Sequence, residues 1–246
     1  TVMLFQQPPG PFLQTRLGRR RLLRGLAAAA IAASPSLLLS GNKALAQAAA
    51  PRPRLPGANP PPILFDVIRN HDVIGTHRVE FRGNPGEFSV RTTIDITVRV
   101  LGVTVFVYRH DGTERWKGGL LQAFDSKTTD DDSEFLVTGR AEAGAFRVVN
   151  RKGTEMAPAD IMVGSYWTPV IAQQSQLIDP QRGRVKPQQL LSTDKMSVQA
   201  GKNSIQATRY QVTGVSDGWV AYDAGGRWVA AELKKKGADI SYQLRG

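Results

Sequence analysis

The stretch VRTTIDITVRVLGVTVFVYRH, residues 90–110, alternates apolar and polar side chains along most of its length. A period of two predicts a β-strand with one buried face. The pair Leu101–Gly102 predicts a two-residue turn, so the two halves should form an antiparallel hairpin. A slip of one residue would turn apolar side chains toward water, so burial should fix the register. The expected pairs on the apolar face are Val100 with Val103, Val98 with Val105 and Ile96 with Val107, and on the opposite face Asp95 with Tyr108 and Thr97 with Phe106.

The same pattern continues on both sides of this hairpin. Turn signals such as RGNPGE, TDDDS, EAGA, AGKN and SDG separate further short alternating runs. One short helix is expected, with Thr168 as N-cap, Pro169 at the first helical position and an end near Gln176. The other expected strands are 63–69, 73–82, 118–128, 134–140, 144–150, 185–199, 203–214, 218–223, 227–234 and 238–245.

About ten or more antiparallel strands that share one apolar face cannot remain a flat open sheet, because that face would stay wet. The sequence therefore predicts a mainly β fold. We expect a large curved antiparallel sheet, either a half-barrel or a barrel, with one short helix near its concave side. This single β-rich domain should occupy residues 63–246, preceded by a flexible leader rich in Pro and Ala over residues 47–62.

Residues 1–46 have the pattern of an export signal. Arg19 and Arg20 begin an RRRLLR run that resembles the twin-arginine signal. The apolar segment 26–39 is fourteen residues long, which is too short to cross a bilayer. Ala44 and Ala46 supply the small side chains that signal peptidase requires, so cleavage is expected after Ala46. We expect a periplasmic protein, with the twin-arginine export machinery and signal peptidase as partners; an ordinary secretory signal remains the alternative.

Composition limits the function further. The formal charge of +11 falls to about +5 when the signal is removed, so a nucleic-acid-binding role loses its main support. The chain has no cysteine, which excludes disulfides, thiolate catalysis and a lipid anchor on cysteine. After cleavage we expect no stable membrane span.

Five sequence segments resemble those of a secreted proteobacterial family, domain of unknown function 6134. They occur in the family's order and extend from Phe65 to Arg245: FDVIRNHDVIGTHRVEFR, VYRHDGTERWKGGLLQAFDSKTTDDD, SYWTP, LIDPQRGRV and WVAYDAGGRWVAAELKKKGADISYQLR. Where relatives commonly have His-Trp-Asn, this chain has Tyr166-Trp167-Thr168. The resemblance implies no catalytic residues. The strand arrangement is also similar to periplasmic lipoprotein carriers, in which a curved sheet cups a lipid over a helical lid; this comparison is a fold analogy, and a fold by itself says little about function.

Catalytic and metal-binding patterns give no positive prediction. His71, His77 and His110 fall in a turn, a strand and the far end of another strand, so neither a metal site nor a cofactor is expected. The run Asp130–Asp132 is more typical of a solvated turn than of a calcium loop. Serines near acids lie in no nucleophile elbow, so no catalytic residue is assigned.

Aromatic side chains are the candidates for ligand binding, because they combine apolar bodies with polar tips. Ordinary core packing is the alternative for each of them. The predicted function is non-covalent binding of a lipid or another apolar or amphiphilic ligand, or of an envelope partner. A hydrolase acting on envelope material and a structural envelope module are the alternatives. The candidate residues are Tyr108, Tyr166, Trp167, Trp219, Tyr222 and Trp228.

Overall fold

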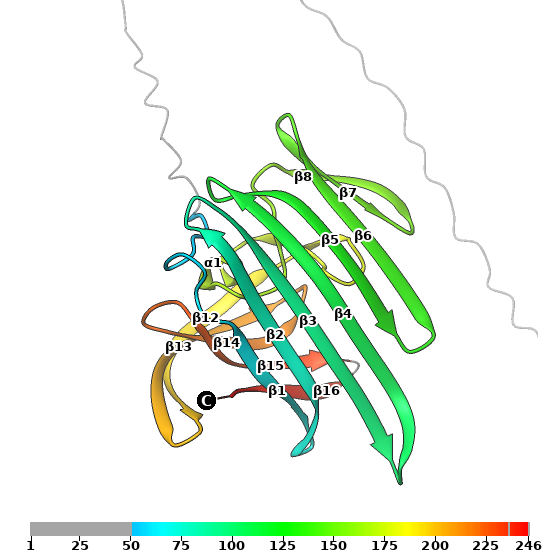
Figure 1. The fold of residues 1–246 in the computed structure, drawn as a ribbon, viewed down its shortest axis with the longest axis vertical. Helices are drawn as coiled ribbons and strands as arrows, with labels where there is room; N and C mark the ends of the chain where they lie inside the picture. The colour runs from blue at the N-terminus through cyan, green and yellow to red at the C-terminus, as the bar shows by residue number, and fades with distance from the viewer. Residues whose placement is uncertain (1–50, 236, 246) are drawn as a thin grey trace, which may run out of the picture. The chain divides into compact units, whose positions relative to one another are not determined.

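A computed structural model describes residues 51–235 and 237–245, and the predicted export signal lies outside these ranges. The described chain is mainly β, with one 13-stranded sheet and a second, three-stranded sheet. The prediction of a large curved antiparallel sheet with one short helix is confirmed (Figure 1). The strands of the large sheet are β1 (Ile63–Arg69), β2 (Asp72–Asn84), β3 (Glu87–Val100), β4 (Val103–Lys117), β5 (Leu120–Asp130), β6 (Ser133–Glu142), β7 (Ala145–Asn150), β8 (Gly153–Pro158), β12 (Gln189–Ala200), β13 (Asn203–Thr213), β14 (Asp217–Asp223), β15 (Trp228–Lys235) and β16 (Ala238–Leu244).

The order of the strands places the last strand of the chain beside the first. The sheet runs β12-β13-β14-β15-β16-β1-β2-β3-β4-β5-β6-β7-β8, so β12 and β8 are its two edges. Phe65 pairs with Leu244, and the Arg245 amide donates to the Leu64 carbonyl at 2.8 Å. Two meanders from opposite ends of the domain therefore join at its centre.

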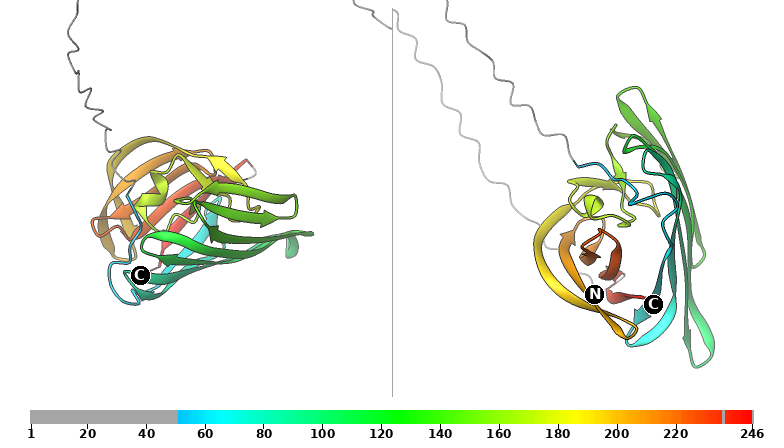
Figure 2. Two further views of the ribbon diagram at one scale, coloured as in Figure 1. Left: turned by 90° about the horizontal axis from the view of Figure 1, so that it is seen from above. Right: turned by 60° about the vertical axis from the view of Figure 1, so that its left-hand side comes forward.

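The segment between β8 and β12 forms the small sheet and the helix. It contains β9 (Met162–Val163), α1 (Pro169–Ala172), β10 (Gln176–Ile178) and β11 (Val185–Pro187). Figure 2 shows that β12–β16 curl around α1 while β2–β6 form a longer, flatter wall. This connecting segment therefore covers the concave face between the two edges of the open sheet.

The start of α1 agrees with the prediction, with Thr168 extended and Pro169 at the first helical position. The predicted end near Gln176 is wrong, because the helix stops after one turn at Ala172. Leu177 and Ile178 are fully buried in β10, beside β9. Burying both side chains in the small sheet outweighs continuing a short helix that has no strong propensity of its own.

The β3–β4 hairpin turns at Leu101–Gly102 as predicted, and Val100 faces Val103. Beyond that pair the predicted register is wrong. A bulge at Val105 shifts the pairing by one, so Val98 faces Phe106 and Ile96 faces Tyr108. An extra residue in one strand of a hairpin produces this kind of shift. Beyond the bulge, the inner face of β4 is therefore built from Phe106, Tyr108 and His110 instead of Val107.

Residues 51–62 of the segment predicted as a flexible leader are described, and they contact the large sheet. Leu55 is only 3% exposed. The Asn59 amide donates to the Gly83 carbonyl at 3.0 Å, and the Gly83 amide donates to Asn59 Oδ1 at 2.8 Å. Residues 51–62 are therefore held against the β2–β3 turn without forming a strand or helix of their own before Ile63.

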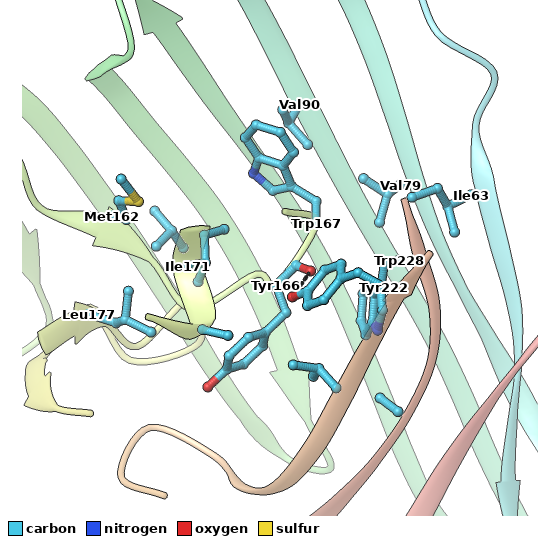
Figure 3. Packing of buried hydrophobic residues seen from close by; sticks show 14 of the residues in the cluster. Ile63, Val79, Val90, Met162, Tyr166, Trp167, Ile171, Leu177, Tyr222 and Trp228 are labelled. Atoms are coloured by element: carbon cyan, nitrogen blue, oxygen red, sulfur yellow. Dashed lines mark hydrogen bonds between the residues drawn. The ribbon is translucent and has the colours of Figure 1, made fainter. Parts of the chain in front are cut away.

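The core lies between the curled strands and the connecting segment. Trp116, Tyr222 and Trp228 are the largest of its fully buried side chains. Figure 3 shows Tyr166 and Trp167 projecting from the segment before α1 into this cluster, with Val90 on one side and Ile171 on the other. The Tyr222 hydroxyl donates to the Tyr166 carbonyl at 2.8 Å, which anchors the segment to β14.

Candidate functional site

A cavity of about 480 Å³ lies against the inner face of β2, β3, β4 and β16. The connecting segment closes it on the other side through Gly164–Ser165 and Pro180–Arg182. A volume of this size is typical of pockets that bind small organic molecules. The apolar residues that line it are Ile74, Ile94, Ile96, Val98, Val105, Phe106, Ala238 and Ile240.

The strand register places two histidines in one row across this face. His77 on β2 pairs with Ile94 on β3, and Ile94 pairs with His110 on β4. The row continues to Phe65 on one side and to Thr128 on the other. Directly paired residues lie on the same face of an antiparallel sheet, and neighbouring strands are about 4.8 Å apart. Both imidazoles therefore face the cavity, with Ile94 between them.

His77 is buried, with 4% of its surface exposed, in an aromatic cage. Its ring centroid lies 5.2 Å from Trp228, 5.5 Å from Tyr242 and 6.2 Å from Phe65, in edge-to-face contacts. Burial, with a smaller repulsion from His110, lowers the pKa of His77 to about 3, so the ring is neutral at pH 7. Neither of its nitrogens has a hydrogen-bond partner among the described residues.

Thr92 and His110 complete the buried polar end of the cavity. Thr92 Oγ1 is buried and, within residues 51–235 and 237–245, has no hydrogen-bond partner. His110 Nδ1 shares a hydrogen bond of 2.7 Å with Thr128 Oγ1. Burial lowers the pKa of His110 to about 4, so this ring is also neutral at pH 7.

Glu114 lies under the same end of the cavity, fully buried. Its Oε2 accepts hydrogen bonds from Trp116 Nε1 at 3.0 Å and Trp167 Nε1 at 3.3 Å. Ser165, which lines the cavity, also hydrogen-bonds to this carboxyl group. Burial raises the pKa of Glu114 to about 7, against the opposing effect of these three hydrogen bonds. The carboxyl group therefore ties the cavity-closing segment to β4.

The opposite end of the cavity is open and positively charged. Arg69, Arg182 and Lys235 all line it, and all three are exposed. Asp130 is the acidic residue that lines it. Arg69 and Lys235 end β1 and β15, so they lie at the same end of the sheet. Water and charged groups can therefore reach this end, which we call the mouth.

The structure separates the aromatic residues that the sequence suggested. Tyr108 lines the cavity, and Trp228 lies directly behind His77. Tyr166, Trp167 and Tyr222 are at most 4% exposed and belong to the core. Trp219 is half-buried away from the cavity, with the Arg209 guanidinium 6.0 Å from its ring centroid.

The histidines also separate. His77 and His110 come together at the cavity, whereas His71 is exposed in the β1–β2 turn. No group of three or more His, Cys, Asp or Glu side chains in the described part of the chain could hold a metal ion. Sequence reasoning did not identify Thr92, Glu114 or the pairing of His77 with Ile94. The alternation with buried Val79 was the available signal that His77 points inward.

Comparison with known proteins places the sequence in a family. Residues 65–245 match the model of a family described as domain of unknown function (DUF6134). The chain belongs to this family. No curated protein matches the sequence.

The DUF6134 chain is similar in structure to a solved protein of a different family. That protein is a beta-barrel-like protein of domain of unknown function DUF1849 from Brucella abortus. The two chains are 14% identical and superpose with a TM-score of 0.56, over 76% of this chain and 96% of the other. At this level of identity the likeness shows the fold. Within the described ranges of the DUF6134 chain, none of the helical segments has the length and apolar character needed to span a membrane.

Proposed function

We propose that this protein is exported to the periplasm and binds an apolar or amphiphilic ligand without covalent chemistry. The observation that carries the proposal is the cavity of about 480 Å³ between apolar strand faces. Protein interiors are close-packed, and spaces much larger than one water molecule are few in them. Apolar surface in contact with water is unfavourable, and a ligand that covers it removes this cost.

The charges at the mouth support an amphiphilic ligand. Arg69, Arg182 and Lys235 border the exposed end, while the isoleucines line the interior. A molecule with an apolar body and a polar or anionic group would place the body inside and the group at the mouth. Cationic side chains attract anionic groups even when they are partly screened by water.

The two alternatives have less support. A hydrolase would be favoured by a histidine that a carboxylate orients. His110 Nδ1 instead bonds to the hydroxyl of Thr128, which cannot stabilise an imidazolium ion as a carboxylate does. A purely structural module would be favoured by an interior filled with side chains, and the cavity argues against it.

The test is native mass spectrometry of the protein isolated from its own cell envelope, followed by solvent extraction. We expect an adduct that is retained under gentle conditions and released by solvent. The extract would then identify the ligand. A clean mass of the polypeptide alone, in repeated gentle preparations, would contradict the proposal.

A variant that fills the cavity should abolish ligand retention. Ala238 lines the cavity, and Ala238→Trp would place an indole in it. We expect the adduct to fall to a tenth of its wild-type occupancy or less, because the added ring occupies ligand space. Ala141→Trp is the matched control, since Ala141 is exposed on β6. An equal loss of the adduct in both variants, or no loss in either, would show that the ligand binds elsewhere.

A further inference from the structure

We propose that the buried end of the cavity is a hydrogen-bonding subsite, formed by His77 and Thr92, for a neutral hydroxyl group on the ligand. The ligand class is then an apolar alcohol, with its hydroxyl group at the closed end and its apolar body along the isoleucines. This inference rests on the proposed binding function and specifies the chemistry of the same cavity.

The first observation concerns the two ring nitrogens of His77. Both ring nitrogens are buried without a partner in the described part of the chain. A buried polar atom without a partner is unfavourable, and native proteins contain few of them. The aromatic cage of Phe65, Trp228 and Tyr242 packs the ring on several sides and holds it in place at the cavity.

The second observation is independent of the first. Thr92 Oγ1 lies on the next strand, also buried and also without a partner within the described ranges. Thr92 pairs with Val79, two residues after His77 on β2, so the two side chains are diagonal neighbours on one face. Both residues line the cavity. One ligand group at this end can therefore contact both side chains.

The protonation state selects a hydroxyl group among the possible polar groups. A neutral imidazole presents one donor and one acceptor, and a threonine hydroxyl can act as either. An alcohol also donates and accepts, so it satisfies both residues in the way that a water molecule would. A carboxylate only accepts, and it would carry its charge to a buried end formed by Ile94 and the aromatic rings around His77.

The experiment compares two probes of similar length, decanol and decyl chloride, by displacement of the apolar fluorophore phenylnaphthylamine from protein expressed from the full chain. We expect decanol to bind at least about fivefold more tightly to the wild type, which corresponds to one net hydrogen bond. Thr92→Val and His77→Phe should each reduce this preference toward unity. Both replacements keep the approximate shape of the side chain, so the cavity should persist.

Thr93→Val is the matched control. It makes the same chemical change one residue along β3, on the face that does not line the cavity. It should retain the full preference for decanol. Circular dichroism and the affinity for decyl chloride report whether each variant still folds and still binds.

The outcomes separate this inference from the proposed function. Equal affinity for both probes in the wild type would overturn the hydroxyl subsite while leaving a ligand cavity. A decanol preference that survives unchanged in both cavity variants would also overturn it. If neither probe displaced the fluorophore in a saturable way, the proposed function itself would fail.

Discussion

Trp167 illustrates at the scale of one residue how the structure revises a sequence-based expectation. The sequence suggested its indole as a candidate for ligand binding, with core packing as the alternative. In the structure it is 4% exposed, lies 5.7 Å from Phe88 and 6.1 Å from Trp116 between ring centroids, and donates to Glu114. It therefore contributes to stability.

Trp167→Ala should lower the free energy of unfolding by about 3–5 kcal/mol, as is usual when a buried large aromatic side chain is removed. Urea unfolding followed by circular dichroism measures the change. Trp219→Ala is the control, because Trp219 is half-buried. Its free energy of unfolding should fall clearly less than that of Trp167→Ala. A variant of Trp167 that is as stable as the wild type would refute its placement in the core.

The raised pKa of Glu114 predicts that the free energy of unfolding depends on pH. Burial raises its pKa to about 7 from 4.5, so the folded state holds a proton that the unfolded state releases between these values. The contribution of Glu114 to stability is therefore greatest below about pH 4.5 and is lost as the pH rises to about 7. The loss is of the order of 3 kcal/mol over this window.

Glu114→Gln should remove this dependence, because glutamine keeps an oxygen acceptor for both indoles and does not ionise. Between pH 4.5 and pH 7.5, the free energy of unfolding of the variant should increase relative to that of the wild type. Taking this difference cancels the opposite contribution of His77 and His110, whose lowered pKa values reduce stability as the pH falls below 6.5. A difference that stays constant with pH would contradict the assignment.

At the scale of the element, Gly75 sets the contact between β2 and β3. A Cβ atom at this position would lie 2.0 Å from the Asp95 carbonyl oxygen and 2.8 Å from Ile96 Cα. Both neighbours are backbone atoms, so they can yield only by separating the strands. Gly75 pairs with Ile96 next to the cavity, and the requirement for glycine is therefore tied to the shape of the candidate site.

Gly75→Ala should destabilise the protein by at least about 3 kcal/mol, because overpacking against backbone cannot relax by a change of side-chain rotamer. Thermal or urea unfolding measures the effect. At Gly86 the nearest atom to an added Cβ is Asn84 Oδ1, at 3.5 Å, so Gly86→Ala should change stability much less. Similar losses in the two variants would show that the close approach at Gly75 is not what matters.

The β3–β4 hairpin shows the limit of pattern reasoning at this scale. Alternation identified both strands, and the positive φ values of Leu101 and Gly102 agree with the two-residue turn. The extra residue at Val105 shifts the register only a few positions beyond this turn. Val103, beside the turn, and Val105, at the bulge, are 64% and 53% exposed. The sequence shows that these strands alternate, but the pattern contains no signal for the bulge.

At the scale of the whole molecule, the large sheet depends on the pairing of β1 with β16, its first and last strands along the sequence. β16 lies between β15 and β1 in the middle of the sheet. The Arg245 side chain also pairs with Asp66 across this junction. Losing β16 would therefore leave the facing edges of β15 and β1 without a partner strand and would remove the cavity residues Ile240 and Tyr242.

A chain that stops at Lys235 should fail to form the native fold, because an interior strand is missing. Gel filtration and near-ultraviolet circular dichroism would show an expanded or aggregated species. A chain that stops at Leu244 retains every β16 pairing and should fold nearly as well as the full chain. A compact, cooperative fold in the shorter variant would refute the central role of β16.

Local signals in the sequence determined the type of most elements, the turn at Leu101–Gly102, the start of α1 and membership in the DUF6134 family. Hydrophobic period and turn residues act over a few positions, so they can be recognised along the chain. Tertiary structure alone decided the junction of β16 with β1, the end of α1, the register beyond the bulge and the meeting of His77, Thr92 and His110 at one cavity. These features depend on which distant residues share a sheet face, and burial across the whole molecule settles that choice.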